Sequence, residues 1–365
     1  MLELAEVLRR YWPEYERLYG EAIPQAHRRA VRAILRCRTA ELGGQLFSCS
    51  PCQQTRFVYH SCNHRACPRC GQSDKNRWLA KQMTRLLPVP YFLVTFTIPA
   101  QLRHLARSHQ KSFFSILLRE SAAALQDIAA NPKHLAAQLG MLGVLHTWTR
   151  QLVYHPHIHF LVPGGGLSAD KLTWVPCPSQ DFLLPVQPLK ARFRWRMRQA
   201  LQEVSTLWQH LQHQPQVWKL DWVVNIQAGG KGEQALAYLG QYIYRTALSS
   251  TRLLSDDHGR ITFRYRNRHT KGWETIAVPA MEFVRRFLQH VLPSGFQRVR
   301  PYGWLSSAAC QKWQRILALL DWTPKPLVTP PPMPALLCPK CQQPMHQVDL
   351  LQPGCSARGP PALCP

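Results

Sequence analysis

The feature that most constrains the fold is the run from Tyr154 to Val162, in which histidines occupy every second position. This alternation predicts a β-strand, because successive side chains of a strand point to opposite faces. His155, His157 and His159 then share one face of the strand. Three imidazoles in a row favour a metal site or a row of catalytic histidines. An amphipathic strand whose wet face happens to contain histidines would show the same pattern.

Two enzyme families fit this strand. Histidine-triad nucleotide hydrolases alternate histidine with apolar residues in the same way and use the middle histidine as nucleophile. HUH endonucleases use a His-apolar-His pair to bind a divalent metal. The strand alone does not choose between them, so the choice depends on the rest of the chain.

The charge of the chain favours a large polyanion as partner. Lys plus Arg number 45 against 20 Asp plus Glu in 365 residues, a formal net charge of +25. Phosphate neutralisation by Lys and Arg supplies most non-specific affinity for nucleic acid, whereas a mononucleotide needs far less charge. The first residues lack the pattern of a signal peptide, and no run of eighteen apolar residues occurs. We therefore expect an intracellular, soluble protein that binds DNA and no membrane.

In a reducing compartment, the 12 cysteines are expected to bind metal rather than form disulfides. Cys49-x2-Cys52 and Cys67-x2-Cys70 have the spacing of two knuckles around one tetrahedral zinc. This zinc would be structural, because so small a module cannot obtain enough folding energy from its core. Further ligands could come from Cys37, Cys62, His60 and His64, with Cys62 favoured.

A similar pair, Cys338 and Cys341, lies near the end of the chain. Its partners could be His346, Cys355 or Cys364. The segment fits a second zinc knuckle or a disordered tail about equally well.

The hydrophobic pattern predicts an α+β fold. A split βαβ arrangement, with helices on one side of an antiparallel sheet, matches the first six elements. A hairpin at about 261–278 and a helix at 281–291 would extend this core. The strands are expected at 89–99, 140–149, 152–162 and 217–227, and the helices at about 108–130, 188–213 and 233–247.

Two tyrosines on the last of these helices complete the pattern. Tyr238 and Tyr242 are four residues apart, which places them on one face of a helix. Such a pair is often structural and packs in a core. Tyr244 lies two positions further on.

In its motifs and their order, the chain resembles rolling-circle transposases of the insertion-sequence-91 family. The shared features are the cysteine module, the His-Pro-His-Ile-His strand before Val-Pro-Gly-Gly-Gly, the Tyr-Leu-Gly-Gln-Tyr helix, and the later Phe-Val-Arg-Arg-Phe and Leu-Pro-Ser-Gly-Phe. The resemblance extends from about residue 36 to 305. The chain departs from the family around Cys62-Asn63-His64-Arg65 and at Tyr244, where the family often has histidine.

The resemblance implies an HUH-endonuclease ferredoxin-like antiparallel sheet with helices, plus a small N-terminal zinc-binding module. His157 and His159 match the metal pair, with His155 as a neighbour, and Tyr238 and Tyr242 match the nucleophiles. The implied domains are a helical and zinc-binding segment at 1–85, a catalytic domain at 86–305, a helix and proline-rich linker at 306–337, and the tail at 338–365.

The implied activity is cleavage and rejoining of single-stranded or hairpin DNA at element ends through a 5′-phosphotyrosine intermediate. Mg²⁺ or Mn²⁺ would serve catalysis and Zn²⁺ would be structural, with Glu233 or Gln241 as a further ligand of the catalytic metal. A bacterial, nucleoid-associated cytoplasmic location follows from the family. The alternatives are a histidine-triad-like nucleotide hydrolase and a non-catalytic zinc DNA-binding protein.

Arginines that alternate with aromatic residues are candidates for contacting a single strand. A solvated basic face explains them about as well. They are Arg194, Arg196, Arg245 and Arg264.

Overall fold

The computed structural model describes the chain except at residues 1, 71, 244–246, 268, 329–334 and 355–365. It divides into two compact units, each assembled from separate stretches of sequence. The sheet unit comprises Lys75–Ile243 and Leu292–Val328. The terminal unit comprises Met1–Asp74, Tyr244–Val291 and Thr329–Pro365.

The sheet unit contains a five-stranded sheet in the order β13-β5-β6-β3-β9, with all neighbours antiparallel. Its main elements follow the split βαβ order, with β13 added at one edge. The predicted α+β class is confirmed. The strands are β3 (Pro90–Thr97), β5 (Gly140–Trp148), β6 (Tyr154–Pro163), β9 (Val223–Lys231) and β13 (Val299–Gly303).

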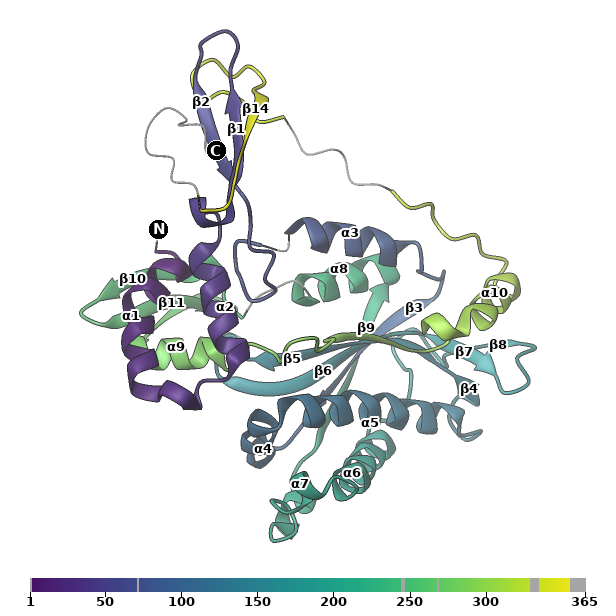
Figure 1. The fold of residues 1–365 in the computed structure, drawn as a ribbon. Helices are drawn as coiled ribbons and strands as arrows, with labels where there is room; N and C mark the ends of the chain where they lie inside the picture. Colours follow the sequence, from purple (N-terminus) through teal and green to yellow (C-terminus); the bar gives the residue numbers. More distant parts are fainter. Residues whose placement is uncertain (1, 71, 244–246, 268, 329–334, 355–365) are drawn as a thin grey trace. The chain divides into compact units, whose positions relative to one another are not determined.

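One face of this sheet carries the main core. Phe96 of β3 and Phe160 of β6 are fully buried, and Phe193 from a covering helix meets the ring of Phe96 edge-on at 4.8 Å. Figure 1 shows the covering helices together on this side of the sheet. They are α4 (Arg103–Ser108), α5 (Gln110–Ala130), α6 (Val186–Gln202) and α7 (Ser205–Trp208).

The other face of the sheet is covered by α8 (Gly232–Ile243), which follows β9 directly, and α3 (Gln72–Met83) lies beside α8 (Figure 1). The two helices of the predicted split βαβ arrangement, α5 and α6, do lie on one side of the sheet, and the next element of the chain, α8, adds a helix on the other side. At the edge of the unit, α10 (Cys310–Leu319) packs through Ile316 against Trp304 and Leu167. A small separate sheet consists of β4 (Ala137–Gln138), β7 (Gly165–Ser168) and β8 (Trp174–Pro176).

The strand expected at 217–227 begins later than predicted. Pro215–Lys219 forms a 3-10 turn, and β9 begins only at Val223. Trp218 and Trp222 stack at 5.5 Å and are buried in the main core. The apolar run at the start of this segment therefore fills the core from a turn instead of pairing in the sheet.

The terminal unit has a helical part. Its α1 (Leu4–Tyr19) begins with a capping box between Glu3 and Glu6 and ends where Gly20 takes a positive φ of 38°. The other elements of this part are α2 (Gln25–Arg36), α9 (Ala280–Leu288), β10 (Leu253–Asp257), β11 (Arg260–Arg266) and β12 (Trp273–Pro279).

The hairpin and helix expected to extend the catalytic sheet, β11–β12 and α9, lie in the terminal unit. There, β10, β11 and β12 form a sheet of their own. Asp256 of β10 accepts hydrogen bonds from Arg10 and Tyr11 of α1 at 3.0 and 2.7 Å. Packing against the N-terminal helix, which the local pattern does not reveal, therefore determines where these elements belong.

The remaining part of the terminal unit joins segments from both ends of the chain. Its three-stranded antiparallel sheet has the order β14-β1-β2. The strands are β1 (Gly44–Ser48), β2 (Thr55–Tyr59) and β14 (His346–Leu351). Across the described residues of both units, every helix is too short or too polar to cross a bilayer.

Candidate functional site

Three histidines from two neighbouring strands form a cluster. His146 of β5 lies opposite His157 of β6, and His159 lies two residues further along β6. The ring centroids of His146 and His159 are 4.8 Å apart, as are those of His157 and His159. One ring nitrogen from each residue lies within 4.8 Å of the others. This histidine cluster could therefore hold one metal ion.

The histidine cluster lies on the face of the sheet opposite the main core. Leu145 and Ile158, the neighbours of His146 and His157 in sequence, belong to that core. Since adjacent residues of a strand point to opposite faces, the imidazoles point away from α5 and α6.

Hydrogen bonds to Nδ1 orient two of the rings. Nδ1 of His157 lies 2.7 Å from the carbonyl oxygen of His155, which can only accept a hydrogen bond. His157 therefore carries its proton on Nδ1, and Nε2 has the lone pair that a metal needs. Nδ1 of His159 lies 2.9 Å from Oγ1 of Thr95 on β3. Such contacts fix the orientation of metal-binding imidazoles.

The surroundings of His157 and His159 keep these two rings neutral. Burial lowers the pKa of His157, and it lowers the pKa of His159 to about 3, with a further contribution from the charge of His157. Neutral imidazole is the form that binds metal. The electrostatics of the histidine cluster therefore suit metal binding at neutral pH.

His155 is not a member of the histidine cluster. Its Nδ1 accepts a hydrogen bond from Nη2 of Arg103 at 2.7 Å. Burial lowers the pKa of His155 to about 4, assisted by the charges of His157 and Arg103. The histidine nitrogens that lie within 4.8 Å of one another come from His146, His157 and His159. His146 therefore replaces His155 in the candidate ligand set.

Of the two residues considered as further ligands, the structure describes the side chain of Glu233. Glu233, at the start of α8, forms an ion pair with Lys325. The side chain of Gln241 lies outside the described part of the structure.

The sequence contains a signal that points to His146. Strands at 140–149 and 152–162 are joined by a short turn and so form an antiparallel hairpin, in which residues near 146 oppose residues near 157. The observed register pairs His146 with His157.

The helix that carries Tyr238 and Tyr242 lies over the face of the sheet that bears the histidines. Gly232, at the start of α8, lies so close to the ring of Tyr91 that an added Cβ would be 2.7 Å from it. Positions 238 and 242 share one face of α8. The side chains of both tyrosines, and all of Tyr244 and Arg245, lie outside the described part of the structure.

The cysteines form two clusters in the terminal unit, and their grouping differs from the prediction. The expectation that Cys49, Cys52, Cys67 and Cys70 surround one zinc is wrong. Cys49 and Cys52 lie in the turn between β1 and β2, whereas the other pair follows β2. The N-terminal cluster consists of Cys37, Cys62, Cys67 and Cys70, and the ribbon cluster of Cys49, Cys52, Cys338 and Cys341.

The N-terminal cluster has the thiol chemistry of a zinc site. Its Sγ atoms of Cys37 and Cys70 lie 3.4 Å apart. A hydrogen bond from Cys67 lowers the pKa of Cys62 to about 5, whereas burial raises the pKa of Cys37 to about 11. The cluster therefore favours the thiolate form at Cys62 and the thiol form at Cys37. A divalent cation would allow all four to ionise.

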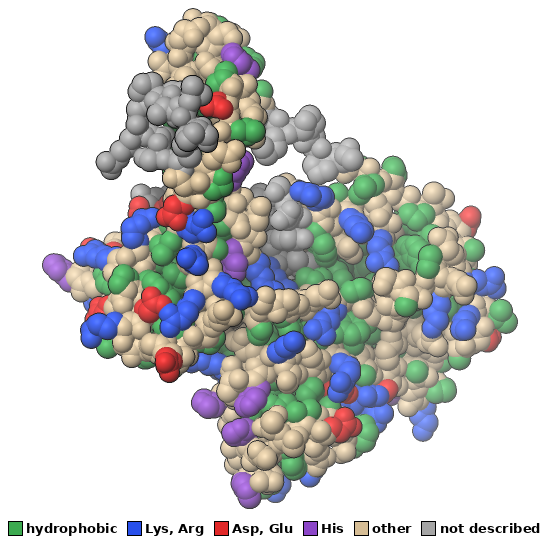
Figure 2. Space-filling view, in the orientation of Figure 1, with side chains coloured by type: hydrophobic (Ala, Val, Ile, Leu, Met, Phe, Trp, Pro, Cys, Tyr) green, Lys and Arg blue, Asp and Glu red, His purple; other side chains and the backbone are tan. Residues whose placement is uncertain are grey.

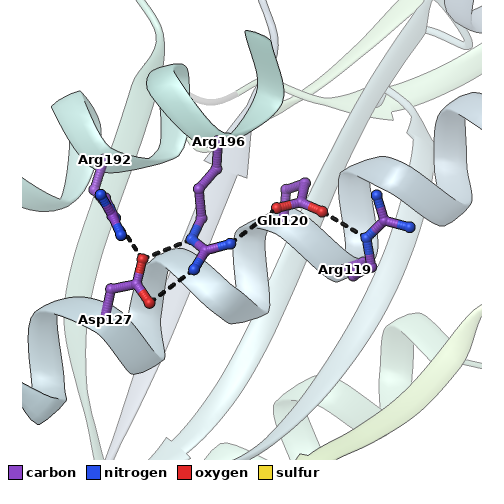
Figure 3. A network of polar contacts seen from close by, with 5 residues as sticks. All are labelled: Arg119, Glu120, Asp127, Arg192 and Arg196. Atoms are coloured by element: carbon purple, nitrogen blue, oxygen red, sulfur yellow. Dashed lines mark hydrogen bonds and ion pairs between the residues drawn. The ribbon is translucent and has the colours of Figure 1, made fainter. Parts of the chain in front are cut away.

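Arg196 has a structural position instead of the predicted DNA contact. It binds Asp127 and Glu120 of α5 from α6, and Arg192 binds the same Asp127 (Figure 3). Burial raises the pKa of Asp127, but hydrogen bonds from Arg196 and Arg192 outweigh it, so this pKa lies below its usual range. The network fastens α6 to α5, on the side of the sheet away from the histidine cluster.

Two other predicted arginines differ in exposure, since Arg194 on α6 is exposed whereas Arg264 is half-buried. The guanidinium of Arg264 lies 5.0 Å from the ring centroid of Trp273, which is 59% exposed. On the face shown in Figure 2, Lys and Arg side chains clearly outnumber Asp and Glu, consistent with a polyanionic partner.

Comparison with known protein families gives two matches. Residues 140–313 match a family described as "Putative transposase". Residues 7–98 match a family described as "Transposase zinc-binding domain". The first includes the histidine cluster and α8, and the second includes the N-terminal cysteine cluster.

Two curated proteins are similar to the chain over most of its length. "Putative transposase y4qJ" of Sinorhizobium fredii is 37% identical over 325 residues, which cover 84% of this chain and 80% of that protein. "Transposase for insertion sequence element IS801" of Pseudomonas savastanoi pv. phaseolicola is 26% identical over 325 residues, which cover 84% and 76%. No solved structure matches the chain.

Proposed function

The chain belongs to the insertion-sequence-91 family of transposases with an N-terminal zinc-binding domain, and we propose that it cuts and rejoins single-stranded DNA through a tyrosine of α8. The observation that carries this proposal is the position of two groups on the sheet. The histidine cluster and the helix bearing Tyr238 and Tyr242 lie on the same face of one sheet.

The donor set of the histidine cluster fits a catalytic divalent cation. Three neutral imidazoles leave coordination positions open for water and a phosphate oxygen, unlike a closed structural zinc site. Nitrogen donors favour Mn²⁺ over Mg²⁺, which prefers oxygen. When bound, such a cation polarises the scissile phosphate and stabilises charge on its oxygens.

Tyr238 or Tyr242 supplies the nucleophile. Its phenolic O–H gives up its proton to solvent as the oxygen forms a bond to phosphorus, the bond to the 3′ oxygen breaks, and the departing oxygen takes a proton from solvent to become a 3′ hydroxyl. The DNA 5′ phosphate then remains on the tyrosine, and reversal of these steps rejoins a strand without ATP. Two tyrosines allow two successive strand transfers.

The cation–π pair of Arg264 with exposed Trp273, and exposed Arg194 beside Trp195, provide stacking and charge for an unpaired strand. The net charge of +25 supports DNA as the partner. We place this activity in the bacterial cytoplasm, at the nucleoid.

A denaturing gel with end-labelled single-stranded oligonucleotides that span the element ends tests this proposal. We expect a protein-linked label that requires Mn²⁺ or Mg²⁺ and is lost in the double variant Tyr238→Phe with Tyr242→Phe. Tyr59→Phe, on β2 of the terminal unit, is the matched control. An adduct that survives in the double variant would refute the assigned nucleophiles. Nucleotide hydrolysis without any adduct would favour the histidine-triad alternative.

A further inference from the structure

Two cysteine pairs at opposite ends of the chain have the same local sequence and the same backbone. Both read Cys-x-x-Cys-Gln-Gln, at residues 49–54 and 338–343. In both, the first cysteine N–H donates to the carbonyl of the last glutamine at 2.9 Å. The glutamine after the second cysteine has a positive φ in both, 54° at Gln53 and 59° at Gln342.

The four sulfur atoms of these pairs are placed as they would be around one metal ion. Sγ of Cys52 lies 3.3 Å from Cys338, 3.4 Å from Cys49 and 3.6 Å from Cys341. Four thiolates around zinc at about 2.3 Å have sulfurs about 3.8 Å apart, whereas disulfide sulfurs are about 2.05 Å apart. All four cysteines are free thiols.

Independent contacts hold the C-terminal pair in place. β14 pairs with β1 from His346 to Leu351. The N–H of Met345 donates to the carbonyl of Leu336 at 2.7 Å, and both side chains pack around buried Cys49 and Cys338. The tail therefore forms the second half of a ribbon whose first half is β1 and β2.

We propose that Cys49, Cys52, Cys338 and Cys341 form a second closed, structural zinc site, which joins the two ends of the chain. Four thiolates and no open position are the donor set of structural zinc. The zinc-binding family match ends at residue 98, so Cys338 and Cys341 lie outside it. The proposal depends only on cysteine geometry and is independent of the DNA chemistry proposed above.

The zinc content of the purified full chain tests this site. We expect two zinc ions per chain by elemental analysis, and one in the double variant Cys338→Ser with Cys341→Ser. The double variant Cys177→Ser with Cys310→Ser changes cysteines outside both clusters and should retain two. One zinc in the unaltered chain, or two in the Cys338/Cys341 variant, would overturn the proposal.

A second measurement on the unaltered chain avoids any loss of folding in the variants. In the zinc-loaded protein, Cys338 and Cys341 should resist alkylation and become reactive after chelation, as read by peptide mass spectrometry. Exposed Cys310 should react at once in both states. Equal alkylation rates of Cys338 and Cys310 before chelation would contradict the site, as would a disulfide between Cys338 and Cys49.

Discussion

At the scale of single residues, the histidine cluster combines three features that metal binding requires. The register of β5 and β6 brings His146 and His157 together, and the sequence spacing adds His159. Burial lowers the pKa of His157 and of His159 and so keeps these two rings neutral. The carbonyl of His155 and the hydroxyl of Thr95 hold two of the rings by Nδ1. His155 thus acts through its backbone rather than its imidazole.

Replacement of His146 should weaken metal binding. His146→Ala removes one of three nitrogen donors, so Mn²⁺ affinity should fall at least about tenfold, since loss of even an outer partner costs about 10–100-fold. Isothermal titration calorimetry measures this change. His213→Ala, at an exposed position, should bind like the unaltered chain. Unchanged affinity in His146→Ala would exclude it as a ligand.

Thr95 should act by positioning His159. Thr95→Val keeps the shape of the side chain but removes the hydroxyl that contacts Nδ1, and Mn²⁺ affinity should fall roughly tenfold. Thr95→Ser retains a hydroxyl and should restore most of the affinity. Equal affinities for the Val and Ser variants would show that this hydrogen bond does not matter.

At the scale of elements, the pairing of α5 with α6 depends on charge as well as on apolar packing. Glu120 is only 6% exposed, and Asp127 binds both Arg192 and Arg196. Two arginines of α6, Arg192 and Arg196, therefore donate hydrogen bonds to buried or half-buried carboxylates of α5 (Figure 3). This is why an arginine-aromatic alternation in the sequence overpredicts DNA contacts.

Asp127→Asn should destabilise the sheet unit at neutral pH by about 1–3 kcal/mol, because it removes a charge that binds two guanidiniums. The folded pKa of Asp127 lies below its unfolded value of about 3.9, so its stabilisation is complete above that pH and is lost as pH falls through the folded value. Urea denaturation should therefore show a deficit for the variant that shrinks in acid.

Asp181→Asn, at an exposed position, serves as the control and should match the unaltered chain at every pH. A deficit of Asp127→Asn that stays constant into strong acid would show that lost packing, rather than lost charge, is responsible.

Strands and helices with strong periodicity were predictable from sequence. The strand with the histidines and the long helix at 108–130 appear as β6 and α5. The failures have a common cause. The segment before Trp222 forms a turn instead of the predicted strand, because the tryptophan rings fill the core. The β11–β12 hairpin lies with α1 instead of the catalytic sheet, and Asp256 of the neighbouring β10 binds Arg10 of α1. In both cases tertiary packing overrides the local pattern.

At the scale of the whole molecule, each compact unit is assembled from stretches that are separate in the sequence. The expected boundaries at 85, 305 and 337 remain predictions for the linear chain, while the terminal unit draws on three separate segments. Cys49 and Cys341 are 292 residues apart, so no local spacing rule could pair them. The knuckles themselves were recognisable, but their partners depend on the tertiary fold.

The basic character of the chain should appear as a steep salt dependence of single-strand binding. Each phosphate contact contributes about 0.7 to the slope of log affinity against log salt. Arg264→Ala should reduce that slope by about 0.7, whereas Arg196→Met should leave it unchanged because Arg196 is bound to Asp127. Fluorescence anisotropy at several salt concentrations measures both. The reverse ranking would contradict the proposed roles.

The central claim is that the tyrosine helix, over the histidine-bearing face of the sheet, attacks DNA. Peptide mass spectrometry of the covalent product formed with single-stranded DNA and Mn²⁺ tests it most directly. The account predicts a nucleotide attached by its 5′ phosphate to the peptide containing Tyr238 and Tyr242. A nucleotide attached to a histidine of β6, or to a tyrosine outside α8, would contradict it.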